Sequence, residues 1–111
     1  MNKLAALRQT YIQADTSQQL DCLADRLDRI ATICTESDDL SSVIELIRES
    51  QYFIEWIVPN LSIDDAAELV DLGRLLAEWK FRWIEISSNP VSVLNVRSLA
   101  QSWHKHLCKV L

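Results

Sequence analysis

The stretch from Ser62 to Ile86 constrains the fold most, because its apolar residues cover most of the surface of a helix. When it is projected at about 100° per residue, two separate apolar stripes emerge. The first contains Leu69, Leu72, Leu76, Trp79, Trp83 and Ile86, and the second contains Ala66, Val70, Gly73, Ala77, Phe81 and Ile84. A helix that is apolar on most of its circumference is surrounded by other elements. The pattern therefore predicts one long helix at the centre of a helical bundle.

The composition favours long helices. One Gly and two Pro among 111 residues leave few positions for the turns of a sandwich or a barrel. Apolar residues make up 49% of the chain and charged residues 24%, which is typical of a soluble globular protein long enough to bury a core. We expect a single all-α domain over residues 1–111.

Apolar periodicity divides the chain into five helical segments with short connections. They are expected at about residues 2–14, 17–35, 40–58, 63–87 and 90–110. The apolar stripe changes phase near 15–17, so the first segment is either a separate short helix or an extension of the second. Short connections indicate antiparallel neighbours. The expected architecture is an antiparallel up-and-down four-helix bundle with an additional short N-terminal helix or helix extension.

Residues that begin helices occur at the expected boundaries. Capping pairs are predicted at Thr16 with Gln19 and at Ser42 with Glu45. Ser62 is predicted to cap the fourth segment, and Asn89 the fifth, which begins with a proline.

The fourth segment is longer than the third. At the rise of an α-helix, the fourth would be roughly 36 Å long and the third about 25 Å. The C-terminal end of the fourth segment, which carries Phe81, Trp83, Ile84 and Ile86, should therefore extend beyond its neighbour. Either the N-terminal segment with Leu4, Leu7 and Tyr11 or a second subunit is expected to cover this end.

Charge and cysteine usage limit the classes of partner. The formal net charge of −5 disfavours nucleic-acid binding, because an acidic surface repels phosphate. No apolar run approaches a membrane span, and the first residues lack a secretory signal. Three Cys, an odd number, fit reduced thiols better than a disulfide framework. We expect a cytoplasmic protein that binds neither nucleic acid nor membrane.

Two groups of residues are candidates for binding another protein. Tyr52 and Trp56 lie one turn apart on the polar face of the third segment, within reach of Arg48. These residue types dominate binding hot spots. The alternatives are that the two aromatic rings pack under the N-terminal segment or that they simply lie against the protein surface.

The second candidate group, a helix interface, comprises Gly73, Phe81 and Ile84. Gly73 costs helix stability but lets another helix approach closely. That helix belongs either to the same bundle, which the packing argument favours, or to a second copy of the chain. A small pocket beside Gly73 is a further alternative.

Residues that suggest an enzyme or a metal site have simpler explanations. Asp64, Asp65, Glu68 and Asp71 could act as acid–base pairs, but the alternating charges farther along this helix are typical of a solvated, salt-bridged face. His104 and Cys108 share a helix face, whereas His106 points elsewhere, so they do not form a metal site.

His106 with Lys109 resembles the phosphoacceptor region of phosphotransfer proteins, which present a His on a four-helix scaffold. The resemblance covers only these two positions, and the glycine that typically follows is absent. It implies a phosphotransfer domain, which is the weakest of the alternatives.

The favoured hypothesis is a non-enzymatic protein that acts by protein–protein contact as an adaptor, regulator or small subunit, and that forms a homodimer. No catalytic residue, cofactor or metal is expected. The main alternative is a carrier of a small apolar ligand or cofactor in the bundle core, lined by Trp79, Trp83, Trp103 and Gly73.

Overall fold

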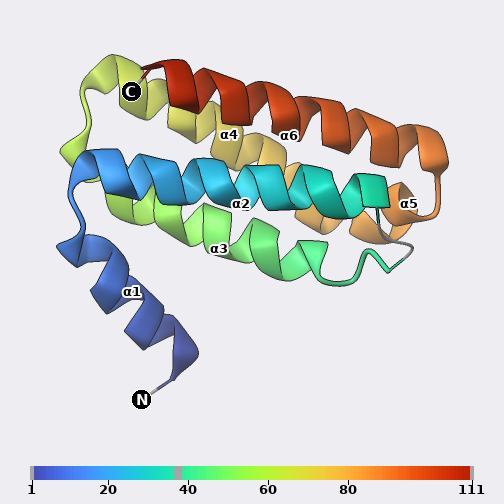
Figure 1. Ribbon diagram of the computed structural model, residues 1–111, viewed down its shortest axis with the longest axis horizontal. Helices are drawn as coiled ribbons and strands as arrows, with labels where there is room; N and C mark the ends of the chain where they lie inside the picture. The colour runs from blue at the N-terminus through green and yellow to red at the C-terminus, as the bar shows by residue number, and fades with distance from the viewer. Residues whose placement is uncertain (1, 37–38, 111) are drawn as a thin grey trace.

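The computed structural model describes residues 2–36 and 39–110, and in these ranges the chain is helical, without a strand. The helices are α1 (Lys3–Gln13), α2 (Thr16–Glu36), α3 (Val43–Ile57), α4 (Ile63–Phe81), α5 (Trp83–Ser87) and α6 (Pro90–Val110), with a 3-10 turn at Val58–Asn60 (Figure 1). The prediction of an all-α fold is confirmed. Within the described ranges, no helix combines the length and the hydropathy needed to cross a bilayer.

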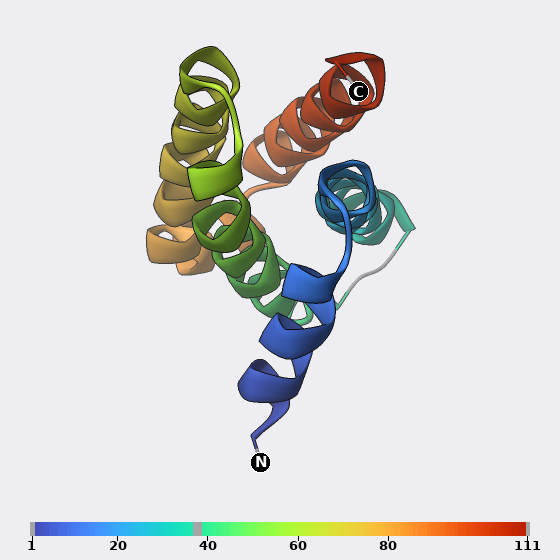
Figure 2. The same ribbon diagram turned by 90° about the vertical axis from the view of Figure 1, so that its left-hand side faces the viewer.

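The four long helices are α2, α3, α4 and α6, and each runs opposite to the preceding one (Figure 1). Helix α2 packs most extensively on α6 and also on α3, while α3 packs on α4. Helices α4 and α6 have little direct packing, and they diverge toward the start of α4 and the end of α6 (Figure 2). Helix α5 joins them at the other end by packing against α6.

The buried core lies around α2 and α3, and α4 lies at its edge. Leu23, Leu27 and Ile47 are fully buried. Helix α4 buries one stripe, which contains Leu69, Leu72, Leu76 and Trp79, while its second apolar stripe faces largely outward. The prediction that residues 63–87 form the central helix is therefore wrong. Both stripes are apolar, but only α3 packs extensively on α4.

The single helix predicted for residues 63–87 is divided at Arg82, whose φ of −102° and ψ of 15° depart from helical geometry. The break accompanies the burial of Trp83. The indole Nε1–H of Trp83 donates a hydrogen bond to the carbonyl oxygen of Leu40 at 3.3 Å, and Ile86 is buried beside the core. The C-terminal end of the segment is thus fastened to the connection that precedes α3.

Two of the predicted helix caps are confirmed. The backbone N–H of Asp65 donates to Ser62 Oγ at 3.2 Å, at the start of α4. The backbone N–H of Val91 donates to Asn89 Oδ1 at 3.0 Å, at the start of α6. Each bond satisfies one of the donors that the first turn of a helix leaves free.

The cap predicted at Thr16 with Gln19 is wrong by one residue. The backbone N–H of Gln18 donates to Asp15 Oδ1 at 2.8 Å, and the backbone N–H of Asp15 donates to Gln18 Oε1 at 3.2 Å. A carboxylate is at least as good an N-cap as threonine, and it also suits the positive end of the helix dipole.

The capping box predicted at Ser42 with Glu45 does not form, because the side chain of Ser42 makes no capping bond. Helix α3 begins at Val43, three residues later than predicted. The preceding turn is held instead by Asp39, whose Oδ1 accepts hydrogen bonds from the Ser41 backbone at 3.0 Å and hydroxyl at 2.7 Å.

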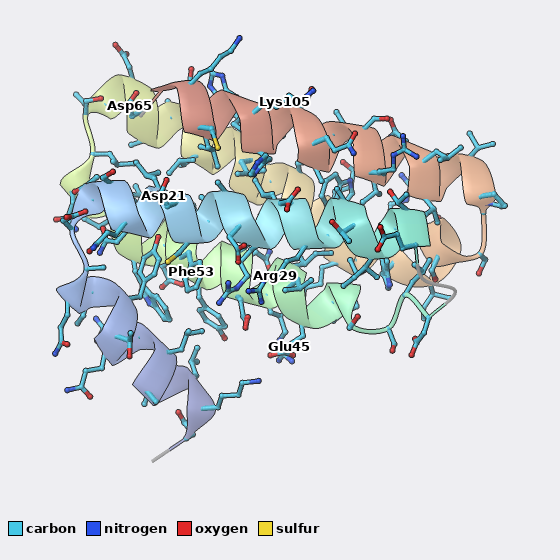
Figure 3. The ribbon with its side chains drawn as sticks, viewed as in Figure 1. Asp21, Arg29, Glu45, Phe53, Asp65 and Lys105 are labelled. Carbon is cyan, nitrogen blue, oxygen red and sulfur yellow. The ribbon has the colours of Figure 1, made fainter. Side chains whose placement is uncertain are left out.

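Helix α1 is separate from α2 and packs on α3. Tyr11 is buried, and its ring stacks with 4.1 Å between centroids on the ring of Phe53. Phe53 is labelled on α3 in Figure 3. The Tyr11 hydroxyl donates to the carbonyl oxygen of Gln19 at 2.9 Å, and Gln19 Nε2 donates back to the carbonyl oxygen of Tyr11 at 2.9 Å. These contacts hold α1 away from the end that carries Phe81, so the N-terminal segment does not cover that end.

Candidate functional site

The outward face of α4 and α5 exposes an apolar stripe. Ile63 is 87% exposed, Val70 41%, Phe81 91% and Ile84 86%. Together with the exposed Ala77, these residues are called the outer stripe. Exposed apolar residues are unremarkable one by one, but several on one face mark an interaction surface. The outer stripe is therefore the main candidate site of this protein.

The spacing of the outer stripe is that of a helix-pairing seam. Ile63, Val70, Ala77 and Ile84 follow one another at intervals of seven residues. Seven residues correspond to about two turns, so Ile63, Val70 and Ala77 fall along one line of α4, and Ile84 follows on α5 after the break at Arg82. The backbone N–H of Ile86 donates to the carbonyl oxygen of Arg82 at 2.9 Å, so helical bonding resumes directly after the break.

Charges along α4 are divided between its two halves. Asp64, Asp65, Glu68 and Asp71 lie in the first ten residues, which contain no base. The sequence from Gly73 to Ile86 contains the bases Arg74, Lys80 and Arg82, and two acids, Glu78 and Glu85.

Ion pairs follow the exposed ridge of α4 and α5. Arg74 lies 3.9 Å from Asp71, and Arg82 lies 3.4 Å from Glu78 and 3.3 Å from Glu85. These exposed pairs contribute little stability, and they agree with the interpretation of this ridge as a solvated, salt-bridged face.

Gly73, the third member of the predicted helix interface, belongs to packing within the chain. A Cβ at this position would lie 3.9 Å from Ile54 Cγ2, which is an ordinary van der Waals distance. Helix α3 therefore approaches Gly73 without needing the absence of a side chain. Phe81 and Ile84 contrast with it, because both are almost fully exposed.

Replacing Gly73 with alanine is expected to raise the free energy of unfolding by up to about 1 kcal/mol. Glycine disfavours a helix interior by roughly that amount, and the space beside Ile54 accepts a methyl group. Urea unfolding followed by circular dichroism measures the change. A loss of stability would mean that the contact between α3 and α4 has no room for a methyl group.

Arg48, Tyr52 and Trp56 lie on the side of α3 that α1 approaches. Tyr52 and Trp56 are half-buried, and their rings stack with 5.6 Å between centroids. Trp56 also lies 5.8 Å from the ring of Tyr11. Trp56 thus packs against the N-terminal segment, as the alternative interpretation of these aromatic rings expects.

Arg48 and Tyr52 line a groove of about 310 Å³ between α1 and α3, together with Leu4 and Leu7. Arg48 is exposed and lies 3.8 Å from Glu45. The groove brings an arginine and an aromatic ring together, but Glu45 and Glu49 on its wall offset its positive charge.

His104 and Cys108 contact each other, whereas His106 contacts a different helix. His104 Nδ1 lies 2.8 Å from the carbonyl oxygen of Ala24 on α2, and Cys108 Sγ lies 3.9 Å from His104 Nε2. His106 Nε2 contacts Glu68 Oε2 on α4 at 2.9 Å. In the described ranges no group of three or more His, Cys, Asp or Glu residues is arranged to hold a metal ion.

The three cysteines are free thiols in different surroundings. Cys108 is exposed, whereas Cys22 and Cys34 are half-buried. Burial raises the pKa of Cys34 to about 11. Because the thiolate is the reactive form, Cys34 is poorly suited to nucleophilic chemistry near neutral pH.

The grooves beside the tryptophans predicted to line a ligand site differ in size. Trp103 lines an open groove of about 480 Å³ together with Lys105, His106 and Lys109. Trp79 and Trp83 are buried, and Trp103 is half-buried. Trp79 borders a groove of about 130 Å³ between α4 and α6. Ligand pockets typically measure about 300–1,000 Å³, so this groove is too small for a typical cofactor.

No protein-family model, curated protein or solved structure matches this chain. The candidate site therefore depends on geometry alone. Phe81 and Ile84 were predicted from the sequence as interface residues, whereas Ile63 and Val70 were predicted in no site. Their interval of seven residues was the available signal, although the same spacing also occurs in buried stripes.

Proposed function

We propose that this protein acts by protein–protein contact, as an adaptor, regulator or small subunit, and that its outer stripe binds a second copy of the chain. The four long helices would serve as an antiparallel up-and-down four-helix scaffold for this surface, in the cytoplasm. The observation that supports self-association best is the exposure of Phe81 at 91% and of Ile84 at 86%.

The hydrophobic effect supplies the driving force for such a contact. Burying a side chain the size of Phe or Ile contributes roughly 1.5–3 kcal/mol. A two-fold symmetric pair would bury each outer-stripe residue twice. The alternative of an apolar-ligand carrier has less support, because the groove beside Trp79 measures only about 130 Å³ and the groove of about 480 Å³ at Trp103 is lined by Lys105, His106 and Lys109.

The test is size-exclusion chromatography with light scattering over a wide concentration range. We expect twice the chain mass at high concentration, and Phe81→Ser should raise the dissociation constant at least about 30-fold, as loss of a hot-spot residue does. Ile84→Ser should act in the same direction.

Ile12→Ser is the matched control, because Ile12 is 47% exposed but lies on α1, away from the outer stripe. It should leave the dissociation constant unchanged. A wild-type protein that stays monomeric at every concentration would refute self-association. A dimer that Phe81→Ser and Ile84→Ser leave intact would place the interface elsewhere.

A further inference from the structure

We infer that two copies pair through antiparallel α4 helices, with Val70 of each copy opposite Ala77 of the other. This inference rests on the proposed self-association and adds its orientation and register. In this register Ile63 faces Ile84, and Ala66 faces Phe81. The pairing is symmetric about a point between Gly73 and Arg74, so one two-fold axis generates the whole contact.

The sizes of the facing side chains favour the antiparallel orientation. The exposed Phe81 lies in the C-terminal half of α4, and its counterpart in this register is the small, half-buried Ala66. A large side chain would thus enter the space above a small one, as in knobs-into-holes packing. A parallel in-register pair would set Phe81 against Phe81 at one end and alanine against alanine at the other, and the helices would splay apart.

The charges favour the same orientation. An antiparallel pair sets Asp64 and Asp65 of one copy near the end of the other that carries Lys80 and Arg82, where residues 73–86 contain one more base than acid. A parallel pair would instead set the two base-free acidic halves side by side, and like charges in close contact repel. In an antiparallel pair the two helix dipoles also point in opposite directions, which is the favourable arrangement.

The central residues permit a close approach. Val70 and Ala77, which flank the proposed axis, are both exposed and smaller than the residues at the two ends of the stripe. Arg74 lies beside the axis and is 80% exposed, at 3.9 Å from Asp71. Such a weak exposed pair can exchange one partner for another across the interface.

Disulfide trapping tests the register. Val70→Cys and Ala77→Cys are made separately in the full chain carrying Cys108→Ser, which removes the exposed native thiol. The two proteins, distinguished by a mass tag, are mixed and oxidised with glutathione disulfide. Residues seven apart are displaced by about 10.5 Å along a helix, and a disulfide needs Cα atoms within about 7 Å. The two orientations therefore trap different pairs.

The expected result is predominantly mixed disulfide between the Val70→Cys and Ala77→Cys proteins, and at least tenfold less when either protein is oxidised alone. Cys108→Ser without an added cysteine is the control and should give no disulfide dimer. Disulfides formed by each protein alone would overturn the antiparallel register in favour of a parallel one. A dimer mass without any trapped pair would also overturn the register, whereas self-association would stand. A monomer mass would refute the proposed function itself.

Discussion

Replacing Tyr11 with alanine is expected to lower the free energy of unfolding by about 3 kcal/mol, as for other buried aromatic residues. The substitution removes the stacking on Phe53 at 4.1 Å and the hydroxyl bond to the carbonyl oxygen of Gln19 at 2.9 Å. In the described part of the chain, α3 is the helix on which α1 packs closely. We therefore expect α1 to detach while α2, α3 and α6 stay folded. Urea unfolding measures the loss, and hydrogen exchange of the α1 amides measures the detachment.

Tyr11→Phe is the matched variant, because it keeps the ring and removes only the hydroxyl. It should cost about 1 kcal/mol, the usual contribution of one hydrogen bond. If Tyr11→Phe were as damaging as Tyr11→Ala, the hydroxyl bond and not the ring would hold α1.

The same pair of proteins gives a pH dependence. Burial, followed by the nearby Cys22, raises the pKa of Tyr11 above its ordinary value of 10.0. Since the unfolded chain then loses this proton more readily than the folded one, the contribution of Tyr11 is fully present below pH 10 and declines as the pH rises above it. Wild type should therefore lose stability above pH 10 more steeply than Tyr11→Phe does.

Leu72→Ala is expected to cost about 3 kcal/mol, within the range for a large-to-small change at a fully buried site. Val70→Ala, two residues away on the outer stripe, should change stability by less than about 0.5 kcal/mol. Thermal unfolding at a concentration where the chain is monomeric compares them without a contribution from association. Comparable losses in the two variants would mean that both faces of α4 are covered within one chain, as the sequence pattern had predicted.

The regular features of the fold could be predicted from local signals. Apolar periodicity located the helices, and Ser62 and Asn89 were identified as caps because their bonds reach only two or three residues along the chain. The shift of the α2 cap to Asp15 depended on a choice between two adjacent good capping residues. Periodicity does not distinguish such neighbours.

The position of α4 could not be predicted, because an apolar stripe is the same in sequence whether it contacts its own chain or another one. Leu72 and Val70 are both aliphatic, yet the first is fully buried and the second is 41% exposed. The deciding fact is tertiary: α1 is held on α3 through Tyr11 and Phe53, so it covers Trp56 and not Phe81. The reciprocal hydrogen bonds between Tyr11 and Gln19 join positions eight residues apart across a turn. No known sequence motif predicts such a pair of bonds.

Helix α1 is anchored near its C-terminal end, where Tyr11 is its buried residue. Tyr11 lies in its last turn, and the eight residues back to Lys3 form an arm of about 12 Å at the rise of an α-helix. A rotation of about 10° at Tyr11 would therefore displace the tip by about 2 Å. The groove lined by Leu4, Leu7, Arg48 and Tyr52 lies between this part of α1 and α3. A change in the packing of Tyr11 on Phe53 would therefore change the width of the groove.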